Sequence, residues 1–436
     1  MVIPLKIGLA GLGTVGAAVV RTIADQRELL TARCGRPVEV VAVTARSRAK
    51  KRDADLRGIR WVKDPLALAV DPEIDVLVEL IGGEGEPALS AIQAALAAGK
   101  HVVTANKALI ARHGASLAAT AERQQVALNY EAAVAGAIPV VKALREGFAG
   151  NEIDRVYGIL NGTCNYILTR MEQEGLSFAD CLADAQRLGY AEADPTFDVE
   201  GFDTAQKLAI LASLTFGVKP DFNAVYVEGI SSIAAADLRA ADELGYRVKL
   251  LGVAVRTDKG IEQRVHPTMV RKDAAIAQVM GVTNAVTLDV RGIPPVTLVG
   301  PGAGGMATAS AVVADIADIA RGDRVLPFGQ PVAKLAASRK APMQRHEGGY
   351  YIRLDARDRP GSAAAIATRL AEQGISLESI MQRQLDAPVP GGAKGAVPVI
   401  LMTYATSEDA VRRALAEVRR DRVISGRPQV LRIEKN

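Results

Sequence analysis

The chain has 436 residues, too many for one hydrophobic core, and its length predicts about two to four domains. Apolar residues make up 49% and charged residues 23%, which is typical of a globular protein, and the small net charge of +4 with interspersed basic residues excludes a nucleic-acid-binding face. Three widely spaced cysteines exclude a disulfide framework, and no apolar run approaches the roughly 20 residues of a membrane span, so we expect a soluble cytoplasmic protein.

Residues 1–150 alternate between short β-rich runs and helical patterns. The expected strands are PLKIGLAG (4–11), VEVVAVTA (38–45), EIDVLVELIG (73–82) and KHVVTA (100–105), with helices such as 14–30 and 87–99 between them. This alternation is typical of parallel βαβ units, so we predict an α/β domain with a doubly wound, Rossmann-type sheet.

The pattern changes near residue 151, and residues 151–305 mix helices and strands. The expected strands are 153–160, 250–257 and 285–292, and the expected helices are 164–175, 178–189 and 203–217. A further helix over 306–322 is expected to return and pack on the first domain. The middle of the chain is therefore predicted to be an α+β domain.

Residues 345–436 form a third predicted unit. Strand patterns at 350–358, 375–384, 397–405 and 428–435 are interrupted by helical patterns at 360–374 and 407–418. The order strand–helix–strand–strand–helix–strand is the ferredoxin-like arrangement. The Pro/Gly-rich stretch APVPGGAKGAVP (387–398) is predicted to be an exposed hairpin loop between the middle strands.

The motif GLGTVG follows the first predicted strand and opens the first helix. Its glycines are Gly11, Gly13 and Gly16, with Thr14 and Val15 between them, which spells G-x-G-x-x-G. Such a turn lets the backbone approach a pyrophosphate, and the helix N-terminus presents free N–H groups to it. A glycine-rich turn without a ligand is the alternative. The context favours a dinucleotide site.

The end of the second predicted strand indicates which dinucleotide is bound. Where an NAD site usually has a carboxylate for the ribose 2′-hydroxyl, this chain has VTARSRAKKR (43–52), whose basic residues are Arg46, Arg48, Lys50, Lys51 and Arg52. Basic residues suit a 2′-phosphate, so the sequence favours NADP over NAD. An ordinary basic surface loop is the alternative interpretation.

The segment EADPTFDVEGFDTAQK (192–207) places five carboxylates before one lysine. It could be a solvated loop, a metal site or a pocket for a cationic group. Its spacing does not match a calcium loop, and the four histidines of the chain lack zinc-ligand spacing, so a metal cage is disfavoured. Asp203 and Lys207 are spaced i,i+4 and share one helix face, either as an exposed salt bridge or as part of a site.

Several motifs together resemble the homoserine dehydrogenase family. They are GLGTVG, TANKALIA (104–111), YEAAVAGAIP (130–139), GILNGTCNYIL (158–168), GYAEADPTFDVEGFDTAQK (189–207) and GPGAGG (300–305). The tail from residue 354 looks like an ACT domain. The resemblance implies an NADP-binding domain over 1–150 with the helix 306–322, a substrate-binding and dimerisation domain over 151–305, and an ACT regulatory domain over 345–436. Cys164 departs from the family pattern, which usually has threonine there.

This resemblance implies a reversible conversion of L-aspartate 4-semialdehyde to L-homoserine in threonine, methionine and isoleucine biosynthesis. Lys207 then matches an acid–base lysine, Asp203 its neighbouring carboxylate and Lys107 a second active-site lysine. Glu192 and Asp198 match carboxylates that bind substrate. Matches to cofactor-contacting positions are Arg46, Thr104, Lys107, Gly189 and Gly304, together with the five named residues of GLGTVG.

The resemblance also implies two further ligands and an oligomer. Carbonyl groups at Glu131, Val134, Gly136 and Ile138 match a sodium site, although an empty structural turn is the alternative. Threonine is the expected effector, bound near residues 358–361 and the GISLES turn (374–379). The tail could instead only dimerise or sense another amino acid. A homodimer or homotetramer is expected.

Two other functions compete with this interpretation. An oxidoreductase of the same fold could act on another amino-acid aldehyde or alcohol. An inactive sensor of NADP and an amino acid would not need Lys107, Asp203 and Lys207 together, so the sequence favours the enzyme.

Overall fold

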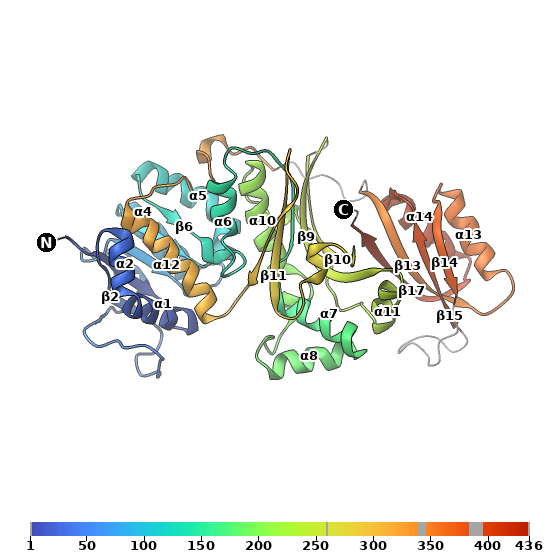
Figure 1. Ribbon diagram of the computed structural model, residues 1–436, viewed down its shortest axis with the longest axis horizontal. Coiled ribbons are helices and arrows are strands. Elements are labelled where there is room, and N and C mark those ends of the chain that lie inside the picture. The colour runs from blue at the N-terminus through green and yellow to red at the C-terminus, as the bar shows by residue number, and fades with distance from the viewer. Residues whose placement is uncertain (1, 259, 339–345, 383–395, 435–436) are drawn as a thin grey trace.

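The computed structural model describes residues 2–258, 260–338, 346–382 and 396–434. Three parts follow one another along its longest axis (Figure 1). Within the described residues, no helix is both long and apolar enough to cross a membrane. Cys34, Cys164 and Cys181 are buried and free.

The N-terminal part contains a six-stranded sheet in the order β3-β2-β1-β4-β5-β6, with every pair parallel. Its strands are β1 (Leu5–Ala10), β2 (Val38–Thr44), β3 (Arg60–Trp61), β4 (Val76–Glu79), β5 (His101–Thr104) and β6 (Leu128–Asn129). Its helices are α1 (Thr14–Asp25), α2 (Arg27–Cys34), α3 (Pro65–Ala69), α4 (Ala88–Ala97), α5 (Lys107–Gln124) and α6 (Val140–Lys142). This strand order is that of dinucleotide-binding sheets and confirms the predicted fold. The helix expected over 14–30 is divided in two at Gln26.

Helix α12 (Gly305–Arg321) lies far along the chain but packs against α1 and α2. Figure 1 shows it in orange beside these blue helices. Val312 and Ile316 of α12 share a buried cluster with Val19 and Ile23 of α1. The chain therefore returns to the N-terminal part after the central part is complete.

The central part contributes β7 to β12 to an 11-stranded sheet whose main order is β12-β11-β7-β9-β10-β17-β13-β15-β14. These strands are β7 (Ile153–Ile159), β8 (Tyr226–Val227), β9 (Tyr246–Thr257), β10 (Gly260–Arg271), β11 (Thr283–Val290) and β12 (Val296–Pro301). The helices are α7 (Gly162–Glu174), α8 (Phe178–Arg187), α9 (Thr196–Val199), α10 (Phe202–Phe216) and α11 (Ala235–Glu243). The expected mixture of α and β is present.

The C-terminal part supplies the remaining strands of this sheet. Its elements are β13 (Glu347–Arg357), α13 (Ser362–Glu372), β14 (Leu377–Gln382), β15 (Ala396–Thr403), β16 (Thr406–Ser407), α14 (Glu408–Arg420) and β17 (Ile424–Ile433). The order β17-β13-β15-β14 is the ferredoxin-like order that the sequence predicts. Of the hairpin loop predicted over 387–398, residues 387–395 lie outside the described residues.

Strand β17 also pairs in parallel with β10 of the central part, with Thr268 opposite Arg432 and Met269 opposite Ile433. One sheet thus runs through both parts. The sequence does not predict this continuity.

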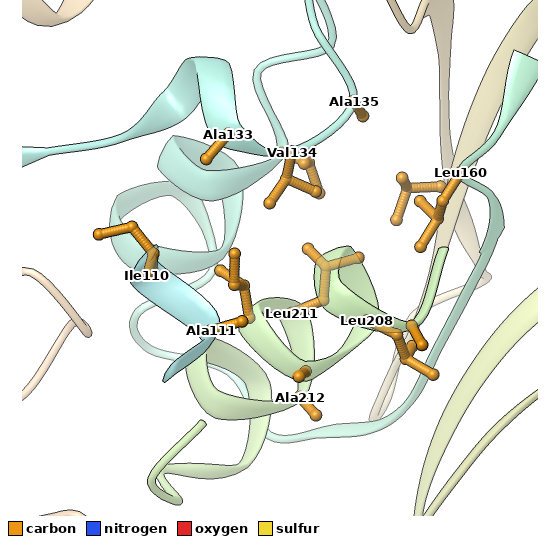
Figure 2. Close-up of a cluster of buried hydrophobic side chains, with 14 of the residues drawn as sticks. Ile110, Ala111, Ala133, Val134, Ala135, Leu160, Leu208, Leu211 and Ala212 are labelled. Carbon is orange, nitrogen blue, oxygen red and sulfur yellow. The ribbon is translucent and has the colours of Figure 1, made fainter. Parts of the chain in front are cut away.

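A buried apolar cluster fixes helix α10 to the N-terminal part. Figure 2 shows Leu211 of α10 between Ala111 of α5 and Leu208, which lies on the side of Leu160, with residues 133–135 above them; all belong to one buried cluster. Full burial of each leucine stabilises the fold by about 1.5–3 kcal/mol. This packing holds the first turn of α10 close to the carboxyl edge of the parallel sheet.

Candidate active site

A cavity of about 560 Å³ lies where the carboxyl edge of the parallel sheet meets the start of α10. The polar side chains that line it include Lys107, Asn161, Asp198, Asp203 and Lys207. The structure therefore brings together both predicted lysines and two of the predicted carboxylates. Val15, Gly189 and Gly304 line the same cavity.

Asp203 lies at the centre of this group, and its side chain is almost completely buried. Its Oδ2 accepts hydrogen bonds from Lys207 Nζ at 2.7 Å and Asn161 Nδ2 at 2.9 Å, and its Oδ1 lies 3.2 Å from Lys107 Nζ. Burial alone would raise the pKa of this carboxyl, but Lys207 and Lys107 hold the pKa well below its usual value. Asp203 is therefore a carboxylate that joins two lysines.

Lys207 is fixed from two sides. Besides Asp203, its Nζ donates to the carbonyl oxygen of Leu160 at 2.7 Å. Two acceptors leave one of the three ammonium protons free. Since Lys207 lines the cavity, this proton can be offered to a ligand there.

Asn161 is a residue of the site that the sequence interpretation did not single out. Its Nδ2 also donates to Asp198 Oδ1 at 2.8 Å, and its Oδ1 accepts from the Cys164 backbone N–H at 2.9 Å. One amide therefore caps helix α7 and positions two carboxylates. Burial, and then the neighbouring charge of Asp203, raise the pKa of Asp198. An asparagine between a strand and a Gly-Thr helix start is the signal that could have identified Asn161.

Cys164, where the family pattern usually has threonine, is completely buried beside this group. Its Sγ lies 3.2 Å from the carbonyl oxygen of Asp198. Burial and the nearby carboxylates raise the pKa of this thiol, so it is neutral. A thiol in this place keeps the turn that holds Asp198.

The glycine motif forms the expected turn before α1. Gly11 has φ of +104°, and a Cβ at this residue would collide with the Leu80 main chain, while one at Gly16 would collide with Gly11. Gly13 precedes α1, and no described atom lies within 4 Å of a Cβ built on it. These residues leave an open approach to the helix N-terminus, which fits a pyrophosphate.

Gly13 and Thr14 line a second cavity of about 410 Å³ together with Arg21, Lys50, Lys51 and Arg52. Arg52 donates to the carbonyl oxygens of Leu12 at 3.0 Å and Lys50 at 2.6 Å, which anchors it next to the glycine turn. Arg46 is exposed and is not among the residues that line this cavity.

Thr104 lies behind the site instead of inside it. It is fully buried, and its Oγ1 donates to Glu79 Oε2 at 2.6 Å and accepts from the Asn106 backbone N–H at 2.9 Å. Asn106 caps helix α5, which begins at Lys107. Thr104 and the buried Glu79 thus support the turn that carries Lys107.

Glu192 remains apart from the cavity, whereas the loop predicted to hold sodium borders it through Gly136. Glu192 is exposed, and its main-chain carbonyl accepts from Gln186 Nε2 at 3.0 Å. In the loop predicted to hold sodium, Ala135 and Gly136 have φ of 58° and 55°. The carbonyls of Glu131 and Ile138 each accept a backbone hydrogen bond there and keep a second lone pair.

The fold and this site define a class of protein. A dinucleotide-binding sheet has Lys107 at its carboxyl edge, helix α10 of the central part adds Lys207 and Asp203 there, and a ferredoxin-like part is attached to the same molecule. The family model described as "Homoserine dehydrogenase, NAD binding domain" matches residues 11–131, and that of the ACT domain matches residues 350–421. The chain is a nicotinamide-dependent oxidoreductase with a C-terminal ACT domain.

The chain belongs to the homoserine dehydrogenase family, whose model also matches residues 139–317, and so acts on a CH–OH group. Homoserine dehydrogenase from Pseudomonas aeruginosa is 45% identical over 99% of each chain. The crystal structure of a homoserine dehydrogenase from Thiobacillus denitrificans has a TM-score of 0.92 and 43% identity, covering 100% of this chain and 99% of that one. A hyperthermophilic archaeal homoserine dehydrogenase in complex with NADPH has a TM-score of 0.64 and 26% identity, covering 74% and 100%.

Proposed function

We propose that this oxidoreductase interconverts L-homoserine and L-aspartate 4-semialdehyde with NADP, and that Lys207 transfers the proton at the reacting oxygen. The bound nicotinamide supplies or accepts the hydride. Lys207 Nζ donates a hydrogen bond to the aldehyde oxygen, favours the negative charge that develops there and delivers the proton. In the other direction it takes the proton from the alcohol.

Asp203 and Lys107 support this proton transfer. Asp203 holds Lys207 in place at 2.7 Å, and Lys107 and Asn161 hold Asp203. Lys107 is about one-third exposed towards the cavity, so it can also attract the substrate carboxylate. The Lys207–Asp203–Lys107 group is the observation that carries the proposal.

The substrate is tested by comparing L-homoserine with 4-hydroxybutyrate, which has the alcohol and the carboxylate but lacks the ammonium group. We expect kcat/KM for 4-hydroxybutyrate to be at least about 100-fold lower, because a site built for a charged group rejects an analogue without it. Equal kcat/KM values for the two compounds would indicate that the substrate is another alcohol and not L-homoserine.

Asp198 is our candidate for binding the substrate ammonium group, because it lines the cavity. We expect Asp198→Asn to raise the KM for homoserine about 10-fold or more, since a charged hydrogen bond is worth about 1.5–3 kcal/mol. The resemblance assigns the ammonium group to Glu192 instead, and Glu192→Ala is the variant for comparison. A higher KM only in Glu192→Ala would transfer the role to that residue.

Selectivity for NADP is proposed to depend on Arg52. We expect Arg52→Ala to weaken NADP binding about 10-fold or more and to change NAD binding little, because only NADP carries a 2′-phosphate. Calorimetric titration of both cofactors measures this. Arg46→Ala, from the same basic segment but outside the cavity, is the control, and loss of NADP affinity there alone would assign the phosphate to Arg46.

The remaining proposals concern sodium, assembly and regulation. Sodium is proposed to bind the carbonyl oxygens of Glu131, Val134, Gly136 and Ile138. An unchanged Tm when choline chloride replaces sodium chloride would contradict this site.

A homodimer or homotetramer is proposed, because β12 ends the sheet and exposes Val299. The molecular mass measured by light scattering tests this assembly.

Threonine is proposed to regulate the enzyme through the ACT domain, within the cytoplasmic synthesis of threonine, methionine and isoleucine. In support, Gly361 has φ of +88° and precedes α13, which leaves a sharp turn where strand meets helix. Assays with and without threonine test the regulation.

A further inference from the structure

Asn284 is a residue of the active-site cavity that the proton-transfer group does not use. It lies in β11 and pairs with Gly300 of β12, the first residue of the GPGAGG segment. Only 1% of its surface is exposed, and it lines the same cavity as Lys107 and Lys207. Asn284 therefore forms part of the cavity wall, on the side of the central sheet.

The side-chain amide of Asn284 has no partner among the described residues. Its Oδ1 is enclosed and accepts no hydrogen bond from them, and none of them bonds to its Nδ2. A buried amide without hydrogen bonds has lost those that it makes to water in the unfolded chain, so it destabilises the fold until another group restores them. The hydrogen-bonding capacity of Asn284 is therefore available to a bound molecule.

Two glycines make room for this amide. A Cβ at Gly302 would lie 2.0 Å from Asn284 Nδ2 and 2.6 Å from its Oδ1, so a side chain there would displace the amide. A Cβ at Gly162, the first residue of α7, would lie 3.5 Å from Asn284 Oδ1. The amide is thus enclosed between the start of α7 and the GPGAGG segment, and packing fixes its position.

The cavity around Asn284 suits the nicotinamide end of the cofactor. Val15 of α1 lines this cavity, whereas Gly13, two residues earlier, lines the cavity that contains Arg52. The start of α1 therefore joins the two cavities, as a dinucleotide that extends from one to the other requires. Small apolar residues in the lining leave space for a flat ring: Ala105, Ala132, Ala133 and Ala135.

The polar groups of the substrate already have counterparts in the proposed mechanism. Lys107 attracts its carboxylate, Asp198 binds its ammonium group and Lys207 acts on the reacting oxygen. The carboxamide of nicotinamide is neutral and carries both an acceptor oxygen and N–H donors, so it matches an amide whose own acceptor and donors are unused. Pairing the two amides satisfies Asn284 without burying another charge.

We propose that Asn284 binds the carboxamide of the nicotinamide ring. Its Oδ1 accepts a hydrogen bond from the carboxamide N–H, and its Nδ2 donates to the carboxamide oxygen. These two bonds fix the rotation of the ring and so the face that it presents to the substrate. The role rests on the proposed function, because the reacting ring must enter this cavity.

Calorimetric titration of the full chain with three nucleotides tests this role. They are NADP, its 3-acetylpyridine analogue, in which a methyl group replaces the carboxamide NH₂, and 2′-phospho-ADP-ribose, which lacks nicotinamide. We expect wild type to bind NADP about 10-fold or more tightly than the analogue, because the analogue leaves Asn284 Oδ1 unpaired. Asn284→Ala should bind NADP about 10-fold more weakly than wild type, distinguish the two dinucleotides by less than about twofold and bind 2′-phospho-ADP-ribose as wild type does.

The Tm of the protein without cofactor separates this role from a structural one. Because the amide makes no hydrogen bond to the described residues, Asn284→Ala should have a Tm close to or above that of wild type. Asn151→Ala is the control, since Asn151 is exposed and does not line the cavity, and we expect unchanged Tm and NADP affinity. A lower Tm for Asn284→Ala with unchanged NADP affinity would show that the amide is structural and overturn the proposal.

Two further results would count against the role of Asn284. Equal affinity of wild type for NADP and the 3-acetylpyridine analogue would overturn it without any variant, and homoserine oxidation by the same protein would leave the proposed reaction in place. A higher KM for homoserine in Asn284→Ala, with unchanged NADP affinity, would overturn it and assign the amide to the substrate. Failure of wild type to bind NADP at all would contradict the proposed function, and this role with it.

Discussion

Lys207→Ala is expected to lower kcat for homoserine oxidation by about 10²–10⁴-fold, which is the usual contribution of a positioned acid or base. Cofactor binding should change little, because Lys207 acts on the reacting oxygen and does not line the cavity that contains Gly13 and Arg52. Steady-state kinetics and titration with NADP measure the two effects separately.

The matched control for this prediction is Lys219→Ala. Lys219 is an exposed lysine just beyond the C-terminal end of the same helix, α10, so its replacement removes the same charge far from Asp203. We expect wild-type kcat in this control. An equal loss of kcat and NADP affinity in Lys207→Ala would contradict the proton-transfer role.

Asp203→Asn is expected to reduce both activity and stability. Without the carboxylate, Lys207 and Lys107 share one small site with no countercharge from Asp203, and removal of one partner of a buried pair costs about 3–5 kcal/mol. Because Lys107 is one-third exposed, we expect the free energy of unfolding to fall by about 3 kcal/mol or less. Urea unfolding measures this loss, and we expect kcat to fall about 100-fold or more as Lys207 loses its orientation.

Asp194→Asn is the control for this variant, because Asp194 is an exposed carboxylate of the same acidic segment. Its replacement should leave both the kinetics and the unfolding free energy near those of wild type. Wild-type turnover in Asp203→Asn would show that the Lys207–Asp203–Lys107 group is a structural salt bridge and not the centre of the site.

The parallel sheet and the ACT domain could be predicted because their strands are apolar and bounded by glycine or helical patterns. Strand β10 was missed because it carries Glu262, Arg264 and His266, which are buried against the rest of the long sheet and its ion pairs. Polar residues buried by distant segments leave no apolar alternation in the local sequence. Its pairing with β17 is also a long-range contact that no short motif encodes.

In the candidate site, too, residues in local motifs could be predicted and residues that act through long-range contacts could not. Lys107, Asp203 and Lys207 belong to recognisable motifs, and the fold brings them within hydrogen-bonding distance or close to it. Asn161 and Glu79 act through side-chain contacts with residues far along the chain, which spacing does not reveal. The basic segment after β2 was identified as a whole, but its three-dimensional path selects Arg52 over Arg46 to face the glycine turn.

The most direct test of the central claim is absorbance at the reduced-nicotinamide band, with purified wild type and Lys207→Ala mixed with L-homoserine and either NADP or NAD. We predict a homoserine-dependent increase with wild type, faster with NADP than with NAD, and almost none with Lys207→Ala. No increase with either cofactor, from folded wild type that binds NADP, would contradict the assignment of the reaction. Wild-type rates from Lys207→Ala would contradict the site.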